Sequence, residues 1–123
     1  MPYQAVILTV SGSCAAGTRT DTSGPAIRAM LENAGFAVQA MQTVPDEEGQ
    51  ISAAIVHACD ILQADLVVTT GGTGLSARDV TPEATLAVLD REIRAIPVAM
   101  WVEGLKSCLL YTSDAADDLT RVD

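Results

Sequence analysis

The sequence predicts an α/β domain with three layers, α/β/α, built on a mainly parallel sheet. Apolar runs typical of buried strands, Gln4–Val10, Ala37–Val44 and Asp65–Thr70, alternate with helical patterns along the chain. With 123 residues, 49% of them hydrophobic, the chain is long enough to bury one core. Because strand–helix–strand crossovers are right-handed, we expect the carboxyl ends of the three strands to share one edge, where ligands of such sheets bind.

Each strand has its own signal. Gln4–Val10 is continuously apolar and rich in β-branched residues, which favours a strand buried on both faces. Ala37–Val44 alternates more weakly and ends before Pro45, and Asp65–Thr70 is short and runs directly into glycines. These patterns predict three strands, of which the first and third are of the buried kind.

The helices follow from apolar residues at helical spacing and from end signals. The first starts at Gly24 and closes at Gly35, and its apolar positions are Ile27, Met30, Leu31 and Ala34. The second is patterned by Ile51, Ala54, Ile55, Ala58 and Leu62. We expect Met30, Met41 and Met100 to fill the core.

Two later helices are predicted as well. One opens at Thr81 as N-cap, with Pro82 as the first helical residue, and continues to about Leu89. The other runs from near Pro97 to about Lys106.

Charge and cysteine content exclude several classes of function. The net charge of −9 with no basic cluster argues against nucleic-acid binding, and no apolar run approaches the ~18–20 residues of a membrane span. The cysteines, Cys14, Cys59 and Cys108, never form a CxxC pair, which predicts free thiols in a reducing cytoplasm.

The strongest motif is a glycine-rich segment after the third strand. Glycines there let the backbone approach an anion and present N–H groups to it, and threonine hydroxyls add donors. We therefore predict phosphate binding by Thr70, Gly71, Gly72, Thr73 and Gly74. The segment is not a P-loop, because it lacks GxxxxGK[ST]. Its GxGxxA match is weak, which leaves a dinucleotide oxidoreductase as a distant alternative.

Three further polar residues fall at the same predicted edge. Ser11 follows the first strand, Asp46 follows the second, and Asp79 lies beyond the glycines. Taken singly, Asp46 suits a helix N-cap and Asp79 a solvated loop acid. Together they suit a Mg²⁺-holding or substrate-orienting pair, since Mg²⁺ uses one or two carboxylates plus ligand phosphates.

The run TTGGTGLSARDVTPEAT (Thr69–Thr85) closely resembles the signature of the MoaB/Mog family of molybdenum-cofactor biosynthesis proteins, which is related to the G domain of gephyrin. The resemblance spans residues 4 to 107 in register, and it includes the segments TVS, SGPAI, VPDE and VEGLKS.

The resemblance implies a molybdopterin adenylyltransferase that uses Mg²⁺ and ATP to place AMP on the phosphate of molybdopterin, releasing pyrophosphate. The acids that match the family's catalytic pair are Asp46 in VPDE and Asp79 in RDVTPE. The glycine loop matches its phosphate cradle, and Ser11 lies in its first ligand loop. The partners implied are a pterin and a nucleotide, in a cytoplasmic homotrimer.

The resemblance ends near Ser107, where the family continues through a helix, another buried strand and a closing helix. We expect residues 1–107 to be a partial domain, incomplete at its C-terminus, and residues 108–123 to be a non-family tail. We also expect the chain as written to be inactive or nearly so and doubtful as a trimer. The alternatives are a non-catalytic molybdopterin- or nucleotide-binding module and a related insertase or competence-damage-type domain.

Overall fold

The structure is a computed structural model, which describes residues 2–17 and 19–107. The expected tail, residues 108–123, lies outside the described residues. The elements in chain order are β1 (Gln4–Val10), α1 (Gly12–Ala15), α2 (Ser23–Asn33), β2 (Ala37–Val44), α3 (Glu48–Val56), the π-helix η1 (His57–Ile61), β3 (Leu66–Thr70), α4 (Thr81–Leu86) and α5 (Ala95–Ser107).

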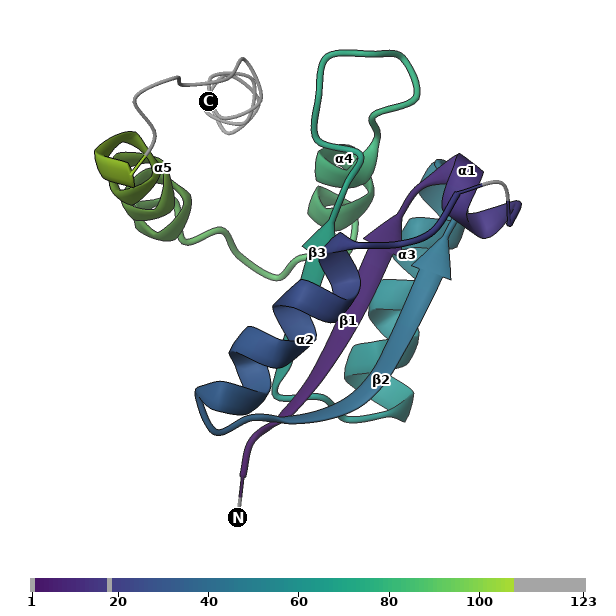
Figure 1. The fold of residues 1–123 in the computed structure, drawn as a ribbon. Helices are drawn as coiled ribbons and strands as arrows, with labels where there is room; N and C mark the ends of the chain where they lie inside the picture. The colour runs from purple at the N-terminus through teal and green to yellow at the C-terminus, as the bar shows by residue number, and fades with distance from the viewer. Residues whose placement is uncertain (1, 18, 108–123) are drawn as a thin grey trace.

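The three strands form one parallel sheet in the order β2–β1–β3. β1 pairs along its whole length with β2, with a register shift between Ala5 and Val6, and with β3 from Ala5 to Thr9. Its central position explains its continuous apolar sequence, because both faces and both edges are covered. The three strands point the same way, so their carboxyl ends meet at one edge (Figure 1), as the sequence predicts.

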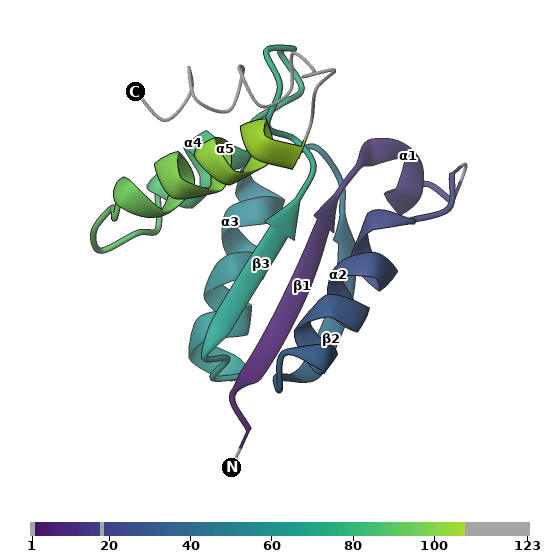
Figure 2. The ribbon, with the colours of Figure 1, turned by 60° about the vertical axis from the view of Figure 1, so that its left-hand side comes forward.

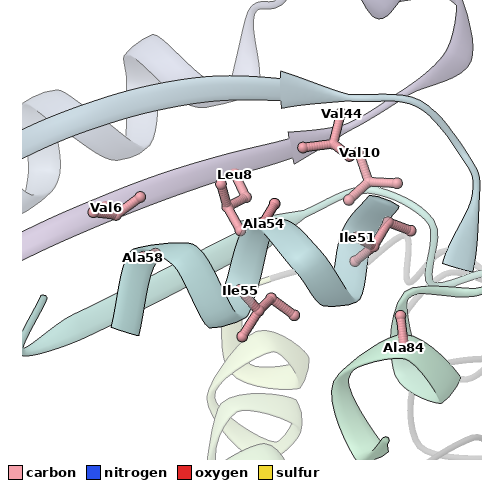
Figure 3. Close-up of a cluster of buried hydrophobic side chains, with 9 residues drawn as sticks. All are labelled: Val6, Leu8, Val10, Val44, Ile51, Ala54, Ile55, Ala58 and Ala84. Atoms are coloured by element: carbon pink, nitrogen blue, oxygen red, sulfur yellow. The ribbon is translucent and has the colours of Figure 1, made fainter. Parts of the chain in front are cut away.

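Helices cover both faces of the sheet, which confirms the predicted α/β/α layers. α2 lies on one face, and α3 on the other (Figures 1 and 2). The core cluster joins Val6, Leu8 and Val10 of β1 to Ile51 and three further residues of α3 and η1, with Val44 of β2 and Ala84 of α4 (Figure 3). Alternation along β1 turns Ala5, Ile7 and Thr9 toward the α2 face.

The prediction that methionines fill the core is wrong for two of the three. Met30 is 71% exposed and Met100 is 70% exposed, whereas Met41 is partly buried. On α2 the face turned inward follows Gly24, Ile27 and Leu31, which leaves Met30 beside that stripe. α5 lies on the β3 side of the sheet (Figure 1). It carries exposed apolar side chains.

Two predictions about the helices are corrected by the structure. α4 ends at Leu86 and not near Leu89. A single helical turn, α1, lies in part of the segment that the sequence predicts to be a loop. None of the helices in residues 2–17 and 19–107 is long and apolar enough to cross a membrane.

Candidate functional site

The glycine loop after β3 folds back onto the end of β1. Gly71 and Gly72 have φ angles of +93° and +69°, which side chains disfavour. A Cβ at Gly71 would overlap the carbonyl oxygen of Val10, and one at Gly72 would overlap Thr81 Oγ1. Glycine is therefore needed at both positions, for backbone conformation and for close approach, as the phosphate-loop hypothesis requires.

Thr81 holds this loop from the other side. Its hydroxyl donates to the Gly71 carbonyl oxygen at 2.9 Å, and its amide donates to the Gly72 carbonyl oxygen at 3.1 Å. The predicted N-cap role of Thr81 is wrong, because α4 begins at Thr81 and its N-cap is Val80. The side chain instead connects α4 to the glycine loop, and Thr81 is buried there, with 3% of its surface exposed.

Asp79 lies against the far end of the same loop. Its Oδ2 accepts a hydrogen bond from the Ser76 amide at 3.0 Å. A Cβ at Gly74 would lie 2.8 Å from this oxygen, so the carboxylate faces the Gly74 backbone. Asp79 thus lies against the end of the glycine loop rather than pointing away from it.

Asp46 joins the loops that follow β1 and β2. Its Oδ2 accepts from the Gly12 amide at 2.8 Å. The N-cap of α3 is Glu47, which makes no side-chain cap hydrogen bond, so the capping interpretation of Asp46 is wrong. Ser11 next to Gly12 caps α1, with Oγ accepting from the Cys14 amide at 3.3 Å.

The two carboxylates therefore contact different loops at one edge of the sheet. Asp46 is bonded to the segment after β1, and Asp79 to the segment after β3. The close approach of Gly71 to Val10 brings these segments into contact. An anion lying on the glycine loop would have carboxylate-bearing loops as neighbours, an arrangement that suits a metal-bridged polyphosphate.

A pocket of about 220 Å³ opens beside the glycine loop. Its walls are residues 9–11, Cys14, residues 19–23 and residues 70–71. Of the predicted site residues it includes Ser11, Thr70 and Gly71, whereas the remaining ones, Asp46, Gly72, Thr73, Gly74 and Asp79, do not line it.

Two charged residues of the pocket were missed by the sequence analysis, Arg19 and Asp21. Asp21 accepts from the Thr9 hydroxyl at 2.9 Å and from the Gly24 amide at 3.1 Å. The available signal was a lone acid two residues before the SGPAI segment, which is typical of an ordinary residue at a helix start.

Within the described part of the chain, no group of three or more His, Cys, Asp or Glu residues is arranged to hold a metal ion. The donors present are two carboxylates that follow the two outer strands of the sheet, and they fit a Mg²⁺ ion only when phosphate oxygens of a ligand complete its coordination.

Comparison with known proteins gives a consistent result. Residues 6–111 match the family described as "Probable molybdopterin binding domain". The molybdopterin adenylyltransferase of Escherichia coli K12 is 38% identical over 89 residues, which are 71% of this chain and 46% of that protein. The molybdenum cofactor synthesis protein cinnamon of Drosophila melanogaster is 35% identical over 101 residues, covering 81% and 17% respectively.

Among solved structures, the molybdopterin biosynthesis enzyme MoaB from Thermus thermophilus is similar, with a TM-score of 0.82 at 41% identity. The match covers 93% of this chain and 69% of that one. The chain spans less than half the length of the E. coli enzyme and of cinnamon.

Proposed function

The chain belongs to the molybdopterin-binding domain family, and we propose that it binds molybdopterin and Mg-ATP for transfer of AMP to the pterin's phosphate. A phosphate oxygen of molybdopterin attacks the α-phosphorus of ATP, and a new P–O bond forms. The bond from that phosphorus to the bridging oxygen breaks, and pyrophosphate leaves with its electron pair. The product is adenylated molybdopterin.

The observation that carries this proposal is the glycine loop packed against the end of β1, with Asp79 at Gly74. Backbone amides of residues 71–74 and the hydroxyl of Thr73 are the donors proposed for the phosphates, and Thr70, whose hydroxyl donates to Ser23, is proposed to line the phosphate site at the start of the loop. Their orientation is set by the fold before the ligand arrives, which is the condition for electrostatic stabilisation of a developing charge. Ser11 extends the donor set toward the pocket.

The nucleophile needs little help from a base, because a phosphate oxygen is already ionised near neutral pH. The work of the protein is then to position two anionic reactants and to offset their repulsion. We assign Asp46 and Asp79 as the residues that hold Mg²⁺ together with the phosphates. When bound, Mg²⁺ would neutralise charge on the phosphates and orient them.

Binding measurements test the proposal independently of turnover. ATP affinity of the full chain is measured by calorimetry with and without Mg²⁺, for the wild type and for Asp79→Asn. The amide of Asn keeps an acceptor for Ser76 but removes the charge. We expect Mg²⁺ to strengthen ATP binding about tenfold in the wild type and to have little effect in Asp79→Asn, with Mg²⁺-free binding similar in both.

ATP binding that is equal with and without Mg²⁺, and insensitive to Asp79→Asn, would contradict the proposal and favour a non-catalytic binding module. Pyrophosphate release from ATP and molybdopterin is the second measurement, and we expect the chain as given to release it slowly or not at all. Release that Asp79→Asn abolishes identifies AMP transfer, whereas ATP hydrolysis without a pterin adduct would favour a related insertase or competence-damage-type domain.

We also propose a cytoplasmic location, and a homotrimer for the full-length family, an assembly that we do not expect this chain to form by itself. Free thiols at Cys14 and Cys59 suit a reducing compartment. Exposed apolar side chains on α5, such as Ile96 and Met100, support self-association. Light scattering tests the assembly of this chain: we expect a particle of 12.8 kDa, and a particle of three times that mass would contradict the expectation.

A further inference from the structure

Asp21, outside the residues assigned above, connects two elements through one carboxylate. Its Oδ2 accepts from Thr9 Oγ1 at 2.9 Å, and Thr9 is the 6%-exposed penultimate residue of β1. Its Oδ1 accepts from the Gly24 amide at 3.1 Å and from Ser23 Oγ at 3.4 Å, both in the first turn of α2. The carboxylate therefore ties the end of the central strand to the start of α2.

The network continues to the third element. Thr70 Oγ1 donates to Ser23 Oγ at 3.3 Å, and Thr70 is the last residue of β3, directly before Gly71. Asp21 thus reaches the first residue of the glycine loop through the Ser23 hydroxyl. Buried Gly24 shows how close this packing is, since a Cβ there would overlap the Asp21 carboxylate.

A helix cap alone does not require this arrangement. The bond to the Gly24 amide is enough to cap α2, and the formal N-cap, Thr22, makes no side-chain cap bond. The contacts to Thr9 and Ser23 are additional, and they lead to the wall that Asp21, Ser23, Thr70 and Gly71 share in the 220 Å³ pocket.

We propose that Asp21 is a positioning residue for the glycine loop. It acts through Ser23 and Thr70 to fix the position of the Gly71 backbone, which is proposed to bind phosphate. This inference rests on the proposed function for its ligand. It differs from capping because it predicts an effect at the end of β3, 49 residues away in sequence, and on ligand affinity.

The first test uses the free full chain. Backbone ¹⁵N order parameters of Gly71 and Gly72 are measured in the wild type, Asp21→Ala, Ser23→Ala and the control Asp90→Ala, which removes an exposed acid that has no part in the network. We expect values to fall from about 0.8 toward 0.6 in the Asp21 and Ser23 variants and not in the control. If Asp21→Ala alters only amides at the start of α2, Asp21 is a cap and the inference is wrong. Should Asp21→Ala fail to fold, Asp21→Asn, which keeps one acceptor atom, replaces it.

The second test is a double-mutant cycle on ATP affinity. We expect Asp21→Ala and Ser23→Ala each to raise the Kd for ATP about tenfold, and the double variant to add little beyond either one, because both break the same connection. Additive effects, or an unchanged Kd in both single variants, would overturn the inference. A wild type that binds no ATP would contradict the proposed function instead, and the glycine order parameters would still decide the role of Asp21.

Discussion

The Gly12 amide donates a hydrogen bond to Asp46 Oδ2 at 2.8 Å, across a separation of 34 residues. This bond joins the loops after β1 and β2 and is supported by the neighbouring bond from the Ser11 amide to the Val44 carbonyl oxygen at 2.9 Å. There is little room around it, because a Cβ at Gly12 would lie 3.1 Å from the same carboxylate oxygen. One carboxylate therefore shapes the edge of the sheet in addition to its proposed metal role.

The two roles of Asp46 can be separated by substitution. Asp46→Ala removes the acceptor of the Gly12 amide and is expected to lower the free energy of unfolding by about 1–2 kcal/mol. Asp46→Asn keeps an acceptor but not the charge, so we expect near wild-type stability in urea unfolding together with loss of Mg²⁺-dependent ATP binding. Equal destabilisation by both variants would show that the charge itself holds the loop.

Substitution of Gly71 separates two reasons for glycine at this position: the close approach of its backbone to Val10, and its positive φ angle. Gly71→Ala adds a Cβ that overlaps the Val10 carbonyl oxygen at φ +93°, and we expect a loss of at least about 3 kcal/mol. The matched control is Gly35→Ala, with φ +99° and nothing within 4 Å of the added Cβ, which should cost only about 1–2 kcal/mol. Urea unfolding compares them, and equal losses would refute the overlap argument.

The strands were largely predictable from the sequence. β1 and β2 have the predicted bounds, Gln4–Val10 and Ala37–Val44, because burial on both faces or alternation leaves a local pattern. α1 was not predictable, since one helical turn is too short to show a period, and its cap, Ser11, resembles any loop serine.

The candidate site was predictable only where the motif itself encodes the geometry. Glycine after a buried strand permits the positive φ angles that Gly71 and Gly72 adopt. The role of Asp21 depends instead on Thr9 and Thr70, residues of two different strands that only the tertiary fold brings to it. Asp46 lies after β2, as the sequence predicts, but its carboxylate does not cap α3. The sequence shows the nearby helix start, whereas the Gly12 amide that donates to Asp46 is 34 residues away and is brought close only by the fold.

The core is expected to depend on Ile51 and not on Met30. Ile51 is 0% exposed within the cluster between α3 and the sheet, so Ile51→Ala should lower the free energy of unfolding by about 2–5 kcal/mol. Met30→Ala on the exposed side of α2 should change it by less than about 0.5 kcal/mol. Urea unfolding of both variants is the measurement. A large loss at Met30 would show that another surface covers α2 in solution.

Thr81 connects α4 to the glycine loop, and its hydroxyl is the feature to test. Thr81→Val keeps the shape but leaves the Gly71 carbonyl oxygen without this donor, 2.9 Å away in the wild type. Thr81→Ser keeps the donor and loses a methyl group. Both should lower stability by roughly 1 kcal/mol, the first through the hydrogen bond and the second through lost packing.

Their effects on ligand binding should differ, because only the valine releases the loop: we expect the Kd for ATP to rise several-fold in Thr81→Val and to stay near wild type in Thr81→Ser. Calorimetry of the two variants decides the point, and weakened binding in Thr81→Ser to the same degree would assign the effect to packing around α4 rather than to the bond that fixes Gly71.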